Sequence, residues 1–158
     1  MADFAIRRAT EADAEAILHC LHTAFAPFEQ YYSPEGYRDT TLTKEMLRER
    51  LRTMSLYVAT SESGEVIGTV GCNLLSVEEG HIRGMAVLEA WQGQGVAQAL
   101  LDVVVAELRD RGCAFISLDT TAPLQRAMRF YEKNGFVRSA KVGDHFGMPL
   151  YEYVKRLR

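Results

Sequence analysis

Two glycines, Gly93 and Gly95, divide this chain where a strand-like run gives way to a long helical pattern. His81–Leu88 is expected as a strand, and apolar side chains recur at helical spacing over Val96–Arg111. A helix that begins directly after glycines presents unpaired backbone N–H groups and a positive partial charge at its N-terminus. The turn therefore predicts an anion site, and phosphate is the anion we expect there.

Two common phosphate-binding motifs fit this turn poorly. A P-loop needs Gly-Lys followed by Ser or Thr, and no such triplet follows Gly95. A dinucleotide fingerprint is closer, since Gly93-x-Gly95 opens a helix and Asp119 ends the next strand. However, Gln98 stands at the third glycine position, and other residues separate Leu88 from Gly93. A nucleotide-dependent oxidoreductase is therefore kept only as a runner-up hypothesis for an enzyme.

The rest of the chain predicts a mixed α/β fold. Strands are expected over Phe4–Arg8, Leu56–Thr60, Glu65–Asn73, His81–Leu88, Cys113–Asp119, Phe136–Val142 and Leu150–Val154. Helices are expected after Thr10-x-x-Asp13, near Thr43, over Val96–Arg111, and with Pro123 at the first position of a helix that runs to Asn134. The segment Pro27–Pro34 is expected as an aromatic loop between the first two helices.

Composition narrows the class of protein. The chain has 158 residues, and we expect one domain, residues 1–158. A net charge of −3 argues against nucleic-acid binding, which needs a basic surface. Three scattered cysteines, no signal-peptide pattern and no long apolar run predict a cytoplasmic protein that does not cross a membrane. His19 and His22 lack a third ligand, so no metal site is expected.

Two motifs resemble those of the GNAT superfamily of N-acetyltransferases. Gln92-x-x-Gly95-x-Ala97 resembles its pyrophosphate loop, Gln/Arg-x-x-Gly-x-Gly/Ala, and Phe130–Phe136 resembles its Phe-Tyr-x-x-x-Gly-Phe segment. The resemblance covers the whole length, although Leu124 stands where many members have Asn. It implies a central twisted mixed sheet of six to seven strands, with splayed fourth and fifth strands and about four flanking helices.

The resemblance implies an acetyl-CoA site in the gap between those two strands. Backbone groups of Met85, Ala86 and Val87 are expected along the pantetheine arm, with the Val87 N–H directed at the thioester carbonyl. The pyrophosphate is expected against the loop that consists of Gln92, Gly93, Gln94, Gly95, Val96 and Ala97.

The resemblance also implies roles for single side chains. Tyr131 matches the family tyrosine that protonates the departing CoA thiolate. His81 falls where some relatives carry a catalytic glutamate, with Glu79 expected on the same strand face, and an imidazole suits a general base near neutral pH. Purely structural roles stay open for Tyr131 and His81. Tyr31 and Tyr32 are expected to contact the substrate.

The function implied is transfer of an acetyl group from acetyl-CoA, a cosubstrate, directly to a primary amine. The acceptor is a small molecule or a protein, and no covalent acyl-enzyme forms. The alternative, which is not an enzyme, is a non-catalytic acyl-CoA-binding sensor or regulatory module. Neither nucleic acid nor membrane is expected as a partner, and a homodimer is expected because many relatives dimerise.

Overall fold

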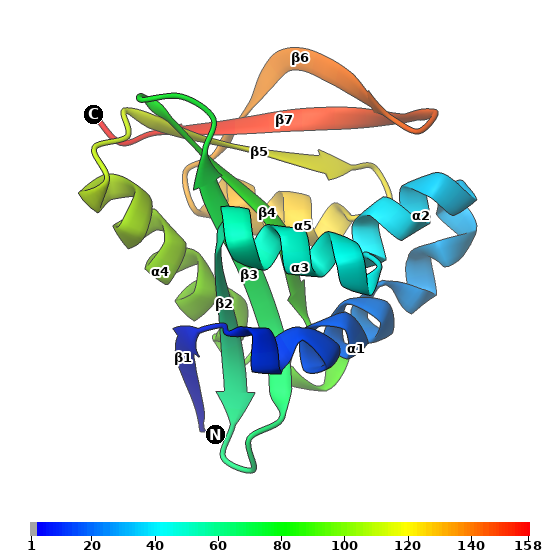
Figure 1. Ribbon diagram of the computed structural model, residues 1–158. Helices are drawn as coiled ribbons and strands as arrows, with labels where there is room; N and C mark the ends of the chain where they lie inside the picture. Colours follow the sequence, from blue (N-terminus) through cyan, green and yellow to red (C-terminus); the bar gives the residue numbers. More distant parts are fainter. Residues whose placement is uncertain (1–2) are drawn as a thin grey trace.

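Residues 3–158 are described by the computed structural model, in which seven strands form one sheet with helices on both faces (Figure 1). The strand order is β1-β2-β3-β4-β5-β7-β6, and only β4 and β5 pair in parallel among these residues. The strands are β1 (Phe4–Arg8), β2 (Ser55–Ser61), β3 (Val66–Leu74), β4 (Glu79–Val87), β5 (Phe115–Thr121), β6 (Val137–His145) and β7 (Met148–Arg156). The predicted mixed sheet of six to seven strands is confirmed.

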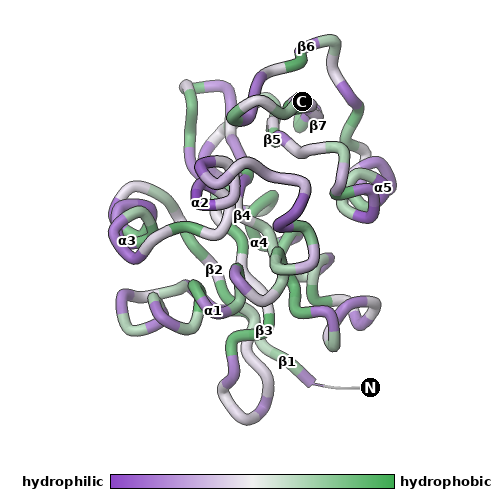
Figure 2. The backbone as a smooth tube through the Cα atoms, turned by 90° about the vertical axis from the view of Figure 1, so that its right-hand side faces the viewer, coloured by the Kyte–Doolittle hydropathy of each residue, from purple (hydrophilic) through white to green (hydrophobic). Residues whose placement is uncertain are grey.

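Each face of the sheet has its own apolar core. The helices are α1 (Ala14–Phe25), α2 (Pro34–Thr41), α3 (Lys44–Thr53), α4 (Val96–Asp110) and α5 (Gln125–Lys133). One core packs α4 and α5 against the strands, and the other packs α1 and α3 against the opposite face. Figure 2 shows hydrophobic stretches along the inner strands and mixed hydropathy along the helices. This alternation along each helix is what buries one side and leaves the other to solvent.

Two sequence predictions for the helices were wrong. Instead of an aromatic loop alone, a 3-10 turn over Ala26–Tyr31 is followed by α2, so the described chain has five α-helices. The Ser33 hydroxyl accepts a hydrogen bond from the Gly36 N–H and so caps the N-terminus of α2, whose first residue is Pro34. Helix α5 begins at Gln125 rather than at Pro123, because a turn from the Thr121 carbonyl to the Leu124 N–H comes first.

The predicted start signals of the other two N-terminal helices are confirmed. The Thr10 N–H donates to Asp13 Oδ2 at 2.8 Å, and Arg7 donates two hydrogen bonds to the same carboxylate. Thr43 caps α3 through its side chain, which accepts from the Met46 N–H. Each signal satisfies N–H groups that the first turn of a helix cannot pair internally.

A bulge in β4 shapes the centre of the sheet. Between the β3 pairs Thr69–Ala86 and Gly71–Arg83, β4 contains an additional residue, and Gly84 there has a positive φ of 70°. Because of the bulge, Ile82 packs in the α4 core while Ala86 packs in the α1 core, although strict alternation would place them together. Pairing of β4 with β5 ends at Ile82, and the two strands then separate, as the resemblance implied.

Candidate active site

Two cavities open where β4 and β5 separate. The larger, of about 480 Å³, lies between the end of β4, the glycine turn and α5. The smaller, of about 250 Å³, lies between β4, β5, the helices α1 to α3 and the β6–β7 hairpin. Five residues line both cavities, namely Phe25, Met85, Leu124, Ala127 and Tyr131. The cavities therefore meet in the gap of the sheet.

The glycine turn borders the larger cavity with backbone rather than with side chains. Gly93 and Gly95 have φ values of 79° and 89°, which L-residues adopt only with strain, and both line the cavity. In the part of the chain described, no side chain caps α4 at Gly95, and its first turn holds no acidic residue. Backbone N–H groups at the start of α4 are thus available to an anion.

Along β4, the backbone of Val87 is directed into the gap. The Leu88 N–H donates to the Ile67 carbonyl of β3 at 2.9 Å, and Val87 lies opposite Gly68. Neighbouring pairs of an antiparallel ladder alternate between bonded and non-bonded, so the N–H and carbonyl of Val87 point away from β3. The Val87 carbonyl accepts the Gln92 side-chain amide at 3.2 Å, which leaves the Val87 N–H as a donor on that side.

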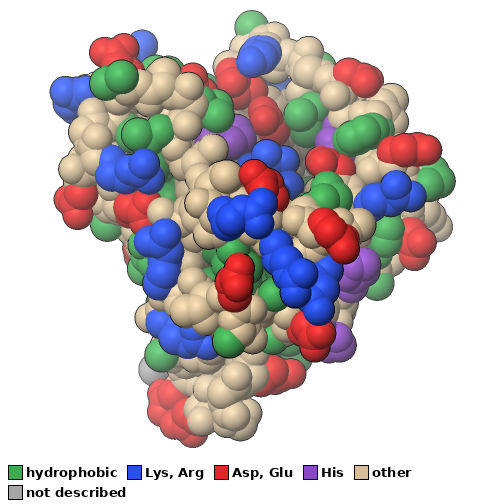
Figure 3. Space-filling model, in the orientation of Figure 1, with side chains coloured by type: hydrophobic (Ala, Val, Ile, Leu, Met, Phe, Trp, Pro, Cys, Tyr) green, Lys and Arg blue, Asp and Glu red, His purple; other side chains and the backbone are tan. Residues whose placement is uncertain are grey.

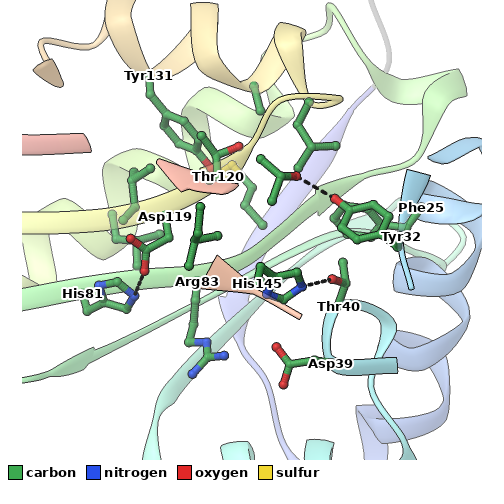
Figure 4. Close-up of a pocket in the computed structure, with 18 of the residues that line it drawn as sticks. Phe25, Tyr32, Asp39, Thr40, His81, Arg83, Asp119, Thr120, Tyr131 and His145 are labelled. Atoms are coloured by element: carbon green, nitrogen blue, oxygen red, sulfur yellow. Dashed lines mark hydrogen bonds and ion pairs between the residues drawn. The ribbon is translucent and has the colours of Figure 1, made fainter. Parts of the chain in front are cut away.

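Tyr131 of α5 lies where the two cavities join. Its side chain is 7% exposed and packs edge-to-face against Phe130 and Phe136. Burial raises the pKa of the phenol to about 12, so the hydroxyl keeps its proton at neutral pH. Figure 4 shows the ring among the side chains that line the smaller cavity. Tyr131 therefore presents a proton donor to both cavities.

On the opposite side of the smaller cavity, His81 belongs to a chain of polar groups. The Ser117 hydroxyl donates to Glu79 Oε2 at 2.6 Å and lies 2.9 Å from His81 Nδ1. A hydroxyl has one hydrogen, so Ser117 accepts from Nδ1–H of the neutral imidazole. The other nitrogen, Nε2, lies 3.7 Å from Asp119 Oδ2 (Figure 4). This arrangement of hydrogen bonds leaves Nε2 as the basic nitrogen of His81.

Burial and neighbouring charges set the titration of this group. Burial lowers the pKa of His81 below its ordinary value, and the Asp119 carboxylate opposes that effect. Burial also raises the pKa of Asp119. His81 is consequently neutral at neutral pH and free to accept a proton. The sequence did not predict that Ser117 and Asp119 would flank His81. They lie two residues apart on β5, and this spacing is the signal that places them on one face.

The remaining predicted residues divide between the cavities and the surface. Tyr32 lines the smaller cavity, and its hydroxyl hydrogen-bonds Thr121 Oγ1 at 2.9 Å. Tyr31 is 53% exposed and lines neither cavity. Gln94 points away, since its side chain donates to the Ala90 carbonyl, and Val96 is buried in the core. The other predicted cosubstrate residues line the larger cavity, namely Met85, Ala86, Val87, Gln92, Gly93, Gly95 and Ala97.

The fold defines a mixed α/β protein whose sheet opens between β4 and β5, with a cavity on each side of the opening. Three comparisons with known proteins specify the class. A family model described as "Acetyltransferase (GNAT) family" matches residues 14–136. The chain belongs to this family. This family membership argues against the hypothesis of a nucleotide-dependent oxidoreductase.

Relatives in sequence match this chain over part of its length. The chain is 31% identical to an aminoglycoside N(6')-acetyltransferase type 1 of Stenotrophomonas maltophilia, over 61% of this chain and 67% of that protein. It is 28% identical to a probable N-acetyltransferase family 8 member 5 of Mus musculus, over 75% of this chain. The chain spans about half the length of that protein and of an N-alpha-acetyltransferase 30 from Schizosaccharomyces pombe.

Solved structures match over almost the full length. A GNAT-family acetyltransferase from Staphylococcus aureus Mu50 has a TM-score of 0.83 and 18% identity, with 99% of this chain and 100% of that chain covered. The PaiA N-acetyltransferase of Thermoplasma acidophilum, solved in complex with coenzyme A, has a TM-score of 0.79 and 18% identity, with 98% and 99% covered. At such identities the match establishes the fold. Among the helices described, none is long and apolar enough to cross a membrane.

Proposed function

We propose that this protein is an acetyl-CoA-dependent N-acetyltransferase that transfers the acetyl group directly to a primary amine. One observation carries the proposal: two cavities meet at Tyr131 in the gap between β4 and β5, one bordered by free backbone N–H groups and the other by His81. An elongated phosphorylated thioester fits the first cavity, and an amine fits the second. The family membership and the relatives named above support the same reaction.

The larger cavity takes acetyl-CoA through backbone contacts. The pantetheine arm lies beside Met85, Ala86 and Val87 as an additional strand would, and the Val87 N–H donates to the thioester oxygen. The loop Gln92–Ala97 holds the pyrophosphate with N–H groups at the positive end of α4. Arg126 lines the same cavity and adds a positive charge. Together these groups fit a long anionic ligand.

The smaller cavity supplies the proton transfers. Acetyl-CoA supplies the acetyl group as a thioester: the amine nitrogen bonds to the carbonyl carbon while the carbon–sulfur bond breaks. His81 Nε2 takes the proton that the amine loses, directly or through water, while Ser117 and Glu79 keep its Nδ1 protonated. Tyr131 gives its proton to the departing thiolate. Tyr32, on the wall across from His81, positions the acceptor.

A tyrosine substitution tests this assignment. Tyr131→Phe removes the hydroxyl but keeps the ring, so acetyl-CoA binding measured by calorimetry stays unchanged. Turnover with the best amine falls by about 100-fold or more, as expected when an acid catalyst is lost. Tyr153→Phe is the matched control, because Tyr153 is also buried and loses a hydrogen bond to Glu132, but it lines neither cavity.

Three results would contradict the proposal in whole or in part. If Tyr131→Phe transfers acetyl groups as fast as the parent protein between pH 6 and 9, the acid role is wrong. If the parent protein binds acetyl-CoA but acetylates no amine of a broad panel, the non-catalytic sensor is the better description. Failure of acetyl-CoA to bind at all would exclude both the acetyltransferase and the acyl-CoA sensor.

The proposal extends to organisation and location. We treat residues 1–158 as one acetyltransferase domain, supported by a single sheet that carries both cavities. A cytoplasmic location is supported by Cys20, Cys72 and Cys113, which are all free and buried, as in proteins of reducing compartments. A homodimer is proposed from the family, and light scattering coupled to size-exclusion chromatography tests it.

A further inference from the structure

Two arginines on the wall of the smaller cavity have guanidinium groups that form no ion pair with the described residues. Arg50 comes from α3 and Arg83 from the bulge of β4, and both line the cavity. Among the residues described, neither guanidinium forms an ion pair or a side-chain hydrogen bond, and Arg50 is only partly exposed. An unpaired charge is costly where it is partly desolvated, so Arg50 in particular favours an anionic partner.

The bulge brings the two arginines together. A Cβ built on Gly84 would lie 3.3 Å from Arg50 Nη1, so Arg50 reaches the β4 backbone directly beside Arg83. Burial, together with the charge of Arg83, lowers the pKa of Arg50 to about 10. Arg50 therefore remains charged at neutral pH, and the two guanidinium groups repel one another. An anion between them would relieve this repulsion and satisfy several N–H donors at once.

The cavity is charged differently at its two sides. The Asp39 carboxylate lies near Arg50 and offsets one of the two positive charges, which leaves about one net positive charge on the helix side. Across the cavity, Asp119 lies beside His81. Figure 4 draws Arg83 between the His81–Asp119 pair and Asp39, and Figure 3 shows Lys and Arg side chains gathered over α3. One end of the cavity thus favours a cation and the other a monoanion.

We infer that the acceptor is a small amine that also carries a carboxylate, held by Arg50 and Arg83 with its nitrogen towards His81 and Tyr131. The inference rests on the proposed function and adds the substrate class. A single carboxylate matches the one net positive charge, and the planar guanidinium fork binds carboxylates in a bidentate manner. The volume of about 250 Å³ suits a small acceptor. Polycations such as aminoglycosides and polyamines would face the arginines unfavourably.

A matched acceptor panel tests the inference. Release of free CoA is measured with α-amino acids, β-alanine and γ-aminobutyrate, each beside its carboxamide, and with O-phosphoethanolamine, spermidine and kanamycin. The best carboxylate should exceed its carboxamide in kcat/KM by about 10- to 100-fold, the value of a hydrogen-bonded charge pair. Arg83→Ala and Arg50→Ala should raise KM for the acid and abolish that preference. Arg48→Ala is the control, since Arg48 is exposed on α3 and lines neither cavity.

The outcomes separate this inference from the proposed function. Acetyl-CoA binding is measured first by calorimetry, and its absence would overturn the proposed function. If acetyl-CoA binds but carboxamides, polycations or O-phosphoethanolamine are preferred, the substrate class is wrong while the acetyltransferase survives. Acetyl-CoA binding without acetylation of any carboxylate amine also overturns the inference. Arg83 is exposed, so Arg83→Ala gives a reading even if Arg50→Ala fails to fold.

Discussion

Replacing Gly95 by alanine tests whether the glycine turn acts through the pyrophosphate. Gly95 has a φ of 89°, and a Cβ there would meet no protein atom within 4 Å. The cost to the free protein is therefore backbone strain alone, about 1–2 kcal/mol for a left-handed L-residue. In a chain of this size the melting temperature should fall by about 2–8 °C. Acetyl-CoA affinity should fall in addition, because the N–H cradle shifts or the methyl group excludes the phosphate.

Gly64 offers a control with matching geometry. It also has a φ of 89°, nothing lies within 4 Å of its Cβ position, and it lines neither cavity. Gly64→Ala should lose the same stability and keep its affinity for acetyl-CoA. Gly95→Ala should bind about 10- to 100-fold more weakly, the value of one hydrogen bond to a charged group. Thermal denaturation by circular dichroism and titration calorimetry measure the two quantities separately.

A truncated ligand makes the test specific. Acetyl-pantetheine lacks the pyrophosphate, so Gly95→Ala should bind it as the parent protein does. The reasoning is refuted if Gly95→Ala binds acetyl-CoA normally, or if it loses affinity equally for both ligands. In the first case the free N–H groups of α4 do not hold the phosphate, and in the second the substitution acts on the whole cleft.

Three further predictions concern other parts of the molecule. Arg7 lowers the pKa of Asp13 to about 2, so this contact stabilises the protein above about pH 4 and the stability is lost as the pH falls through 2. Because Arg7 is half exposed, Asp13→Asn should lower the free energy of unfolding by only about 1 kcal/mol at pH 7, and urea titrations should show a difference that shrinks at acid pH rather than a constant one. Ser117→Ala should reduce kcat/KM about fivefold and move the acid limb of the pH profile to lower pH, because one hydrogen bond to His81 is lost; an unchanged profile contradicts the positioning role. Leu108→Ala removes a fully buried side chain of the α4 core and should cost about 2–5 kcal/mol in denaturant unfolding, with acetyl-CoA affinity unchanged.

Local patterns in the sequence predicted most of the elements correctly. The strand before the glycine turn, the long helix after it and the buried strand that follows were all expected within two residues of their observed ends. Periodicity and turn chemistry act between neighbours in the chain, so they are readable without the fold. Where a competing local signal existed, the prediction was wrong: Ser33 and Pro34 start a helix at the end of Pro27–Pro34, the segment whose aromatic residues and prolines had indicated a loop.

The functional site was readable from the sequence only in part. The glycines of the turn and Tyr131 belong to contiguous motifs, and the structure places them around one gap. Tyr31 and Tyr32 are adjacent in the chain, yet only Tyr32 lines a cavity, because the side chains of neighbouring residues diverge. The sequence pattern held no means of choosing between them.

The sequence by itself determined the class of fold, the glycine turn before α4 and the family, since each depends on residues close together in the chain. Only the tertiary structure decided which distant side chains share a cavity. The bulge at Gly84 breaks the alternation of β4, and the end of β4–β5 pairing opens the gap. These two features bring Arg83 beside Arg50 and place His81 against Ser117 and Asp119. Register and bulges arise from packing across the whole sheet, so no local pattern contains them.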